Sequence, residues 1–418
     1  MIISRIARTV NPVNMDEPMT LPQLVEFSSR TVSGQFVTPE SCKNISTAFR
    51  CINILSDDVA KMPIQTFINR QIGKIERMKP NNRIENLAWL LEVRPNRYMT
   101  PFTFKKILMG WLVMHGDAYA WQPPRRGGRQ RELFVLRSDT TYPVYDTNGD
   151  IWYRTIFRDG SVEYLPDVEV LHLMINSSDG ITGRGTIQFA RETMGRQLGA
   201  YDTQARFYSQ GLNSSGLIWA NGDINKEAKE KIRSEYENAM SGRENAYRLA
   251  VMDNKIAKFE QITMKPVDAQ FLEGIAENDL EIANFFGMPL YKLNMGKQTY
   301  NSNEQANLDY LNTTLDPYLV QWEQEALLKW LSEEEQNYTY LRFNRDALLR
   351  TDAETRTNIL QKRILSGQLS PNEGRQIEDL SAYPGGDLRF IPSNMAVITE
   401  DGQVVAISKA VENPDIPA

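Results

Sequence analysis

Two helical segments frame a shorter segment of a different pattern, and this order limits the folds open to the chain. Residues 187–211 and 267–286 both place apolar residues at helical spacing, and Gly211 is suited to end the first helix. Residues 212–264 instead begin with the strand-like SGLIWA, pass through a charged helix that opens near Asn225, and continue with the strand-like AYRLAVMD and AKFEQITM. The sequence therefore predicts a small α/β unit inserted between two helices.

The second of these helices is locally unbalanced in charge. It contains no lysine or arginine, and its acidic residues are Asp268, Glu273, Glu277, Asp279 and Glu281. A row of carboxylates without cations can be a solvent-facing surface, a subunit-pairing surface, or a surface that repels phosphates. The residues by themselves leave these interpretations open.

A polar connector, YKLNMGKQTYNSN, separates the acidic helix from a long helix with one apolar stripe. The stripe consists of Leu308, Leu311, Leu315, Tyr318, Trp322, Ala326 and Trp330. Pro317 lies within this helix, where it cannot donate a hydrogen bond to the carbonyl of Thr313 and crowds that residue. We therefore expect a kink at this point.

Two further helices are predicted in the N-terminal half. Apolar residues at helical spacing from Ala48 to Met62 indicate an amphipathic helix that Pro63 ends. A later helix should begin at Pro101, because proline fits the first helical position and Thr100 can cap it.

Short alternating runs between residues 133 and 173 predict a β-meander. Asx-Gly pairs at 148–149 and 159–160 tolerate the positive φ of tight hairpin turns. Together with Asn148, the flanking Asp146 and Asp150 could be imagined as calcium ligands, but the later bidentate glutamate of such a loop is missing. A plain turn is the favoured interpretation.

The C-terminal part contains two patterns that are typical of capping boxes. Thr351 with Glu354 and Ser370 with Glu373 have the required spacing, so two short helices are expected. Beyond Pro384 the sequence predicts a tail with strands.

Length and composition bound the class of protein. A chain of 418 residues is too long to fold around one compact core, and a content of 41% hydrophobic residues is sufficient for folded cores. Residues 1–40 lack sustained periodicity and predict a loosely held arm. The net charge of -6 offers no large basic surface, and the apolar run at 107–114 is too short to span a bilayer. Cys42 and Cys51 fit neither a disulfide framework nor a zinc site, which favours a reducing, cytoplasmic origin.

No pattern in the sequence is typical of an active site. The only histidines, His115 and His172, lie in apolar runs, and nucleophile, zinc and phosphate-loop motifs are missing. We therefore expect no catalytic residue, no metal and no cofactor. The glycine-rich stretch at 180–185 matches no nucleotide fingerprint and favours a flexible turn. The basic loop at 123–131 can be a phosphate contact or a solvated loop.

Several segments, taken in order, resemble the portal proteins of long-tailed bacteriophages, which are head-to-tail connectors. They are AFRCINILSDDVAKMPIQTF, LLEVRPNRYMTPFTFKKILMGWLVMHGDAYAW, VLHLMINSSDGITGRG, RFYSQGLNSSGLIW, DAQFLEGIAENDLEIANFFGMP, NSNEQANLDYLNTTLDPYLVQWEQ, FNRDALLRTDAETR and LSPNEGRQIEDL. The resemblance covers residues of roughly 45–387. One departure is Gly185-Thr186, where many relatives carry a Ser-Pro pair.

The resemblance implies an α+β portal fold with wing, stem, clip and crown regions, assembled as a ring around a central channel. The implied regions are an N-terminal arm at 1–40, a wing at 41–186, a first stem helix at 187–211, a clip at 212–264, a second stem helix at 265–287, a tunnel loop at 288–303, a kinked wing helix and strand at 304–345, and a crown with a C-terminal tail at 346–418.

The same resemblance implies a structural function without catalysis. Such a ring, usually a dodecamer, forms one capsid vertex of the virion, through which double-stranded DNA is packaged and later ejected, and it assembles in the host bacterial cytoplasm. The implied partners are other copies of the chain, the large terminase, a head–tail adaptor and the major capsid protein, with no membrane. The candidate channel or DNA-facing residues are Asp268, Glu273, Glu277, Lys297, Gln298, Tyr300 and Asn301.

Two alternatives stay open at this point. The first is a phage head-completion or DNA-binding structural protein that acts without a ring, which a monomeric or dimeric mass would favour. The second is a phage hydrolase that uses Asp57, Asp58 or His172, which would require these groups to converge in one pocket.

Overall fold

The structure is a computed structural model that describes residues 30–71, 74–78, 87–124, 132–210, 215–220, 225–227, 229–231, 234, 256–262, 268–295, 303–348, 353–378, 380–389, 396–398 and 404–406. For some of them, including 268–272, only the backbone is described. The chain divides into two compact units, Met1–Arg345 and Asp346–Ala418. The division falls where the predicted crown begins.

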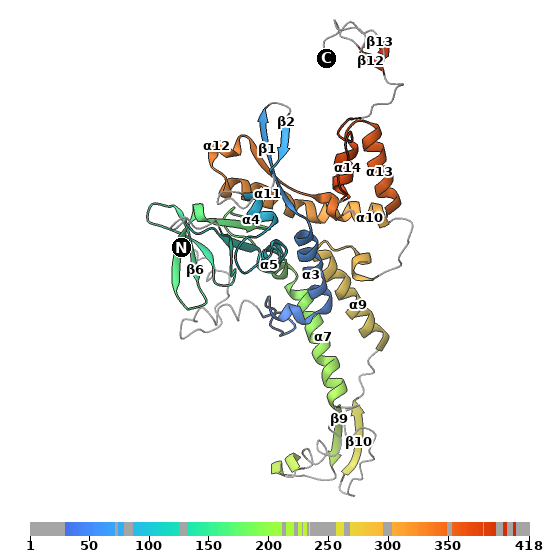
Figure 1. The fold of residues 1–418 in the computed structure, drawn as a ribbon. Coiled ribbons are helices and arrows are strands. Elements are labelled where there is room, and N and C mark those ends of the chain that lie inside the picture. The colour runs from blue at the N-terminus through green and yellow to red at the C-terminus, as the bar shows by residue number, and fades with distance from the viewer. Residues whose placement is uncertain are drawn as a thin grey trace. The chain divides into compact units, whose positions relative to one another are not determined.

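Helices α3 (Ser46–Lys61) and α5 (Pro101–His115) pack against each other in the first unit (Figure 1). Leu55 and Leu108 are fully buried between the helices and their neighbours. The Thr100 hydroxyl accepts a hydrogen bond from the backbone N–H three residues later, at 3.2 Å. Both predicted helices and the predicted cap are confirmed.

The predicted kinked helix has three parts, which are α10 (Asn303–Tyr310), a π-helical segment at Leu311–Leu315 and α11 (Asp316–Trp330). Pro317 lies in the first turn of α11, and the residue four positions before it falls within the π-helical segment. Proline has no N–H to donate to the carbonyl four residues earlier, and its ring crowds that carbonyl. The regular α-helical hydrogen bonding is therefore interrupted at this carbonyl. The buried members of the predicted stripe are Leu311, Leu315, Trp322, Ala326 and Trp330.

Strand β1 (Ile64–Gln71) lies between β2 (Lys74–Arg77) and β11 (Thr339–Phe343). The β1–β11 pair is antiparallel and joins segments far apart in the sequence. Helix α11 packs on β11, and the ring of Trp322 meets the ring of Phe343 edge-on with 6.2 Å between centroids. These contacts join the N-terminal and C-terminal segments of the first unit.

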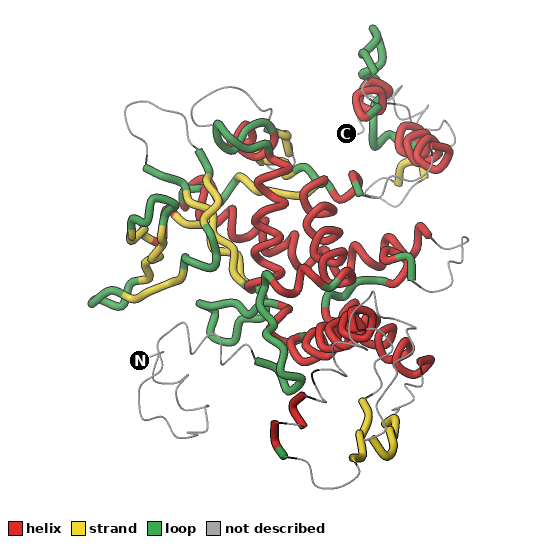
Figure 2. The backbone as a smooth tube through the Cα atoms, turned by 90° about the horizontal axis from the view of Figure 1, so that it is seen from below, coloured by secondary structure: helices red, strands yellow, loops and turns green. Residues whose placement is uncertain are grey.

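The predicted β-meander divides into two three-stranded antiparallel sheets, which lie beside the helices of this unit (Figure 2). One sheet contains β5 (Tyr142–Tyr145), β6 (Ile151–Ile156) and β7 (Val162–Pro166). The other has β3 (Asp117–Trp121) between β4 (Phe134–Leu136) and β8 (Val170–Met174).

The prediction of a single meander up to residue 173 is therefore wrong for its first and last strands, β4 and β8. Residues 170–173 of β8 are all buried, because one face packs on α11 and the other contributes to the core beside β6. Both predicted turns are confirmed, since Gly149 and Gly160 have φ of 92° and 84°. The Asp146 carboxylate accepts two backbone N–H groups of its own turn, at 2.8 and 2.9 Å.

The helix expected at 187–211 is interrupted. It consists of α6 (Thr186–Phe189) and α7 (Arg191–Gln210), separated at Ala190, whose ψ of 4° leaves the helical range. Ala190 is fully buried, and α6 packs against α5, so tertiary packing sets this break. Gly211 lies outside the described residues.

The predicted insert is represented by a hairpin of β9 (Ser215–Ala220) and β10 (Ile256–Ile262). The Lys229 N–H donates to the Asn225 carbonyl, which gives one helical turn where a charged helix is expected. Residues 230, 231 and 234 are helical as well, whereas the remaining residues of that helix and the segment AYRLAVMD lie outside the described residues. Helix α9 (Asp268–Phe285) confirms the acidic helix, and a 3-10 turn, η3 (Leu290–Leu293), follows it.

Residues 30–40 correct the expectation of a loosely held arm. Thr31 is buried, and the Val32 N–H donates to Glu192 of α7 at 3.1 Å. A Cβ added at Gly195 would lie 2.6 Å from the Thr31 side chain, so the absence of a side chain on α7 lets this segment approach closely. Residues 1–29 lie outside the described part of the chain.

The second unit contains helices α13 (Ala353–Leu365) and α14 (Pro371–Ile377) and a hairpin of β12 (Ala396–Ile398) and β13 (Val404–Ala406). Ser370 and Glu373 form the predicted capping box. The hairpin confirms the strands expected in the tail, whereas the cap at Thr351 lies outside the described residues.

Short elements complete the description, and they are η1 (Ser41–Asn44), α4 (Leu87–Glu92), η2 (Asp167–Glu169), α12 (Glu333–Gln336) and η6 (Arg345–Ala347). Among the described residues, none of the helices combines the length and apolarity that a bilayer crossing needs.

Candidate functional site

Helices α7 and α9 form an antiparallel pair (Figure 1), and the β9–β10 hairpin lies between them in the sequence. Arg196 of α7 donates to Glu281 of α9 at 2.5 Å and to Asn278 at 3.4 Å. The fully buried Gln197 donates to Asp279 at 3.3 Å. Early residues of α7 thus meet late residues of α9, and polar contacts fix their register.

The acidic residues of α9 have different surroundings. Asp279 also accepts a hydrogen bond from the Thr47 hydroxyl of α3 at 2.7 Å, so it holds α9 against the core of the unit. Glu281 is paired with Arg196. Glu273 and Glu277, one helical turn apart, are exposed and have no ion pair within the described part of the chain. The side chain of Asp268 is not described.

An open groove of about 710 Å³ follows the α7–α9 pair. Its lining comprises Arg196, Ala200, Gly274, Ile275, Glu277, Asn278, Leu280, Glu281 and Asn284. The small residues Ala200 and Gly274 leave this space between larger neighbours, and Leu280 is 40% exposed beside it. The groove brings an exposed acid and an exposed apolar side chain onto one surface.

The four predicted residues of the polar loop, Lys297, Gln298, Tyr300 and Asn301, lie outside the described residues. The described base of this loop is anchored. The Lys292 ammonium pairs with Asp58 of α3 at 3.0 Å and lies 4.4 Å from the centroid of the Tyr310 ring.

The residues of the hydrolase alternative do not converge. Asp57 pairs with Lys106 at 2.6 Å, while Asp58 pairs with Lys292 and with a lysine of its own helix. His115 packs against the ring of Trp111, and burial lowers the pKa of its imidazole. These groups serve separate structural contacts.

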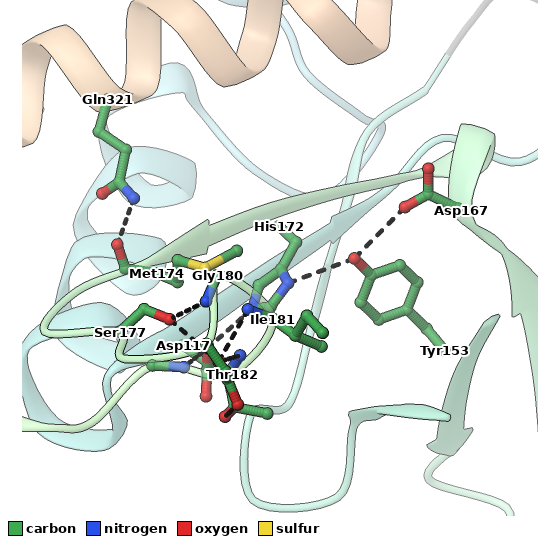
Figure 3. A network of polar contacts seen from close by, with 12 residues as sticks. Asp117, Tyr153, Asp167, His172, Met174, Ser177, Gly180, Ile181, Thr182 and Gln321 are labelled. Carbon is green, nitrogen blue, oxygen red and sulfur yellow. Dashed lines mark hydrogen bonds and ion pairs between the residues drawn. The ribbon is translucent and has the colours of Figure 1, made fainter. Parts of the chain in front are cut away.

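His172 lies instead in a chain of five polar residues, here called the His172 network. It runs from Asp117 through His172 and Tyr153 to Asp167 (Figure 3). Asp167 in turn pairs with Lys329. His172 is 3% exposed. Its Nε2 lies 2.8 Å from Asp117 Oδ1, and its Nδ1 lies 3.2 Å from the Tyr153 hydroxyl. The network cannot be predicted from sequence spacing, because its members come from five different elements, β3, β6, η2, β8 and α11.

The glycine-rich stretch at 180–185 forms a closely packed turn. Asp179 accepts the backbone N–H groups of Ile181 and Thr182, each at 2.9 Å, and these hydrogen bonds hold the pKa of Asp179 well below its usual range. A Cβ added at Gly185 would lie 2.1 Å from the Met114 carbonyl oxygen. The predicted turn is confirmed, but packing fixes it in place.

The fold is that of a portal protein. It is similar to an HK97 family phage portal protein from Corynebacterium diphtheriae, with a TM-score of 0.55 and 16% identity over 75% of this chain and 96% of that chain. It is also similar to a chain in the neck of an empty gene transfer agent particle, with a TM-score of 0.53 and 22% identity over 82% of this chain and 94% of that one.

The sequence places the chain in a family. The phage portal protein family matches residues 46–379, which is most of the chain, so the chain belongs to this family. Relatives include the portal protein of Enterobacteria phage HK97, 27% identical over 88% of this chain and 86% of that protein. The probable portal protein of Streptomyces phage phiC31 is 24% identical over 91% of this chain and 84% of that protein. The resemblance to portal proteins inferred from the sequence is therefore confirmed. Portal proteins are structural proteins of the virus particle.

Proposed function

We propose that this chain is one subunit of a portal ring of twelve copies at a capsid vertex, through which double-stranded DNA is packaged and ejected. Membership of the portal family supports this proposal. A similar chain in the neck of a native gene transfer agent particle, with a TM-score of 0.51 over 86% of this chain, comes from a structure computed with C12 symmetry.

The exposed acidity of α9 is the observation on which the conduit function depends. Asp279 and Glu281 are used in contacts within the subunit, whereas Glu273 and Glu277 are free of ion pairs among the described residues. Repeated around a ring, such carboxylates would repel DNA phosphates. A lysine-lined wall would instead bind them, with a salt dependence that grows by about one unit per contact. A DNA conduit requires weak contacts.

The polar loop supplies the remaining part of this proposal. Lys297, Gln298, Tyr300 and Asn301 would give sparse contacts to DNA at the tunnel loop, while Asp268, Glu273 and Glu277 line the channel wall. A few cations among many carboxylates would guide DNA without holding it.

The remaining regions are assigned to partners. In this proposal α7 and α9 are the stem, residues 212–264 are the clip that docks the large terminase and later the head–tail adaptor, and the wing faces the major capsid protein. The ring assembles in the host cytoplasm and becomes part of the virion. The energy for DNA movement comes from the terminase, and this chain supplies geometry and charge.

The first test of this proposal is the assembly state. Native mass measurement and negative-stain images of the purified chain should show rings of about twelve copies. A monomer or dimer under the same conditions would favour the alternative of a structural protein that acts without a ring.

The second test inverts the exposed charge in rings whose assembly has been verified. Glu273→Lys combined with Glu277→Lys should lower packaged DNA, because new cations bind phosphates and slow its passage. The matched control is Glu334→Lys, which changes an exposed acid on α12. Packaging equal to wild type in the double variant would remove the channel role of α9.

A further inference from the structure

The second unit has no hydrophobic interior in its described part. The residues that are buried there are Ser370, Asn372, Gly374 and Gly386, and none of them has an apolar side chain. The first unit, in contrast, completely buries large side chains such as that of Trp322. Helices are stable in a folded protein when an apolar face is buried against another element. The helices of the second unit therefore need a surface against which to bury their apolar side chains.

Helices α13 and α14 lie side by side and contact each other (Figure 1). Ile364 of α13 lies against Gly374 of α14, because a Cβ added at this glycine would be 2.9 Å from the Ile364 side chain. Ile364 and Leu360, which lies one turn before it, are only partly buried. The contact between the two helices thus does not supply the missing interior.

Large apolar side chains of the second unit are exposed instead. Five of them are between 40% and 69% exposed, and they are Ile359, Leu365, Ile377, Leu380 and Leu388. Single exposed apolar residues are common on protein surfaces, but these occur together in a unit whose described part buries no apolar side chain. This combination is typical of a surface that is covered in the assembled protein.

The exposed side of α13 is apolar and basic. Ile359, Lys362 and Arg363 are exposed and lie three and four residues apart, so they share one face of the helix. Neither Lys362 nor Arg363 forms an ion pair with a described residue. A surface that packs against this side should therefore be apolar and acidic.

The exposed side of α14 has this character. Glu373 and Ile377 lie one turn apart on it, and Leu380 follows directly after the helix. Glu373 pairs with Arg389 at 3.5 Å, but both side chains are largely exposed, so this ion pair leaves the carboxylate accessible. The exposed sides of α13 and α14 are therefore complementary in charge, and both carry apolar side chains.

We propose that the second unit completes its hydrophobic core between copies of the chain, with the exposed side of α13 of one copy packed on the exposed side of α14 of the next. This inference rests on the proposed ring, in which equivalent units recur around one axis. The contact joins two different surfaces, so it is heterologous and repeats from copy to copy until the ring closes. Burial of the apolar side chains then stabilises each unit only when its neighbour is present.

Cysteine crosslinking in assembled rings of the full-length chain tests this contact. The native Cys42 and Cys51 are buried, so a short bis-maleimide reagent should react with introduced, exposed cysteines. In the double variant Ile359→Cys and Ile377→Cys, crosslinks between α13 of one copy and α14 of the next should give a ladder of multimers on a denaturing gel. Each single variant is a matched control without a ladder, because a head-to-tail contact does not place a residue beside its own equivalent.

The outcomes of this experiment separate the contact from the ring. A ladder from either single variant would overturn the head-to-tail pairing. Only monomeric bands from the double variant, in rings verified by imaging, would overturn the proposal and would leave the proposed ring intact, because the second unit would then be covered by its own chain or by another protein. Absence of rings in the wild type would instead contradict the proposed function.

Ile359→Ser distinguishes a contact between copies from an isoleucine that only faces solvent. Replacing an exposed side chain normally changes stability little. If Ile359 packs on the next copy, the amides of α14 should exchange about tenfold faster in rings of this variant than in wild-type rings. Val168→Ser, which removes an apolar side chain of η2 that is 75% exposed, is the control and should leave exchange in α14 unchanged. The proposal would also be overturned by unchanged exchange of α14 in Ile359→Ser.

Discussion

At the scale of single residues, Lys105 is unusual because it is a buried cation that pairs with no carboxylate among the described residues. It is 4% exposed, its ammonium donates to the Met62 carbonyl, and its Nζ lies 6.0 Å from the centroid of the Phe343 ring. Burial lowers the pKa of Lys105 from 10.5 to about 8. The charge therefore costs stability in the folded chain.

This cost predicts a pH dependence. The folded-state pKa lies below the unfolded value, so the penalty is fully present below about pH 8 and is lost as pH rises from about 8 to 10.5. Lys105→Met should raise the free energy of unfolding at neutral pH by about 1–3 kcal/mol and should remove the alkaline rise. Denaturant titrations at several pH values measure both effects.

The neighbouring Lys106 provides the matched control. Its side chain is 38% exposed and pairs with Asp57, so Lys106→Met should keep the alkaline rise. If Lys105→Met retained the same rise, another group would be responsible.

At the scale of elements, the first unit depends on a close approach between the end of α5 and the loop before α6. Cβ atoms added at Gly183 and Gly185 would lie 2.0 and 2.1 Å from backbone carbonyl oxygens of residues 116 and 114. Backbone atoms cannot move aside as flexible side chains can. Both positions therefore require glycine for packing.

Gly185→Ala should lower the free energy of unfolding by about 1–3 kcal/mol, because the new methyl group forces the loop away from α5. Chemical unfolding followed by circular dichroism measures the change. Gly199→Ala, within helix α7, is the control. Its Cβ would make only ordinary contacts, with Gln35 at 3.8 Å and Ser33 at 3.9 Å, so this change should be neutral or stabilising. Equal stability of Gly185→Ala and wild type would contradict the packing argument.

At the scale of the whole molecule, the chain divides into two compact units, Met1–Arg345 and Asp346–Ala418. In the second unit, Ser370 and Glu373 cap α14, and the Asn372 amide donates to the Tyr383 carbonyl at 3.0 Å and to Asp387 at 2.9 Å. These bonds join residues within the second unit.

Loss of the cap should therefore affect one unit only. Ser370→Ala should destabilise the second unit by about 1 kcal/mol, which gives roughly fivefold faster hydrogen exchange in α14 and unchanged exchange in α3. Ser366→Ala, which removes an exposed hydroxyl after α13, should change neither. Faster exchange in α3 after Ser370→Ala would show that the two units are coupled.

Local signals in the sequence predicted the elements with short-range causes. The Thr100 cap, the Ser370 capping box and the glycine turns depend on atoms a few residues apart, so spacing alone reveals them. The apolar stripe around Trp322 and the acidity of α9 can likewise be predicted from the order of the residues alone. The family resemblance rests on the same kind of ordered segments.

Only the tertiary structure decided which of these elements meet. Strand β8 pairs with β3 instead of extending the meander, and α6 and α7 are separated at Ala190. These features, like the partners of Asp279 and His172, depend on groups far apart in the chain. No spacing encodes such contacts, because burial and charge pairing act between whatever residues the packing brings together. The sequence by itself therefore determined the helices, turns and acidic character of this portal-family chain, and the packed structure decided which acids stay exposed and which histidine lies among carboxylates.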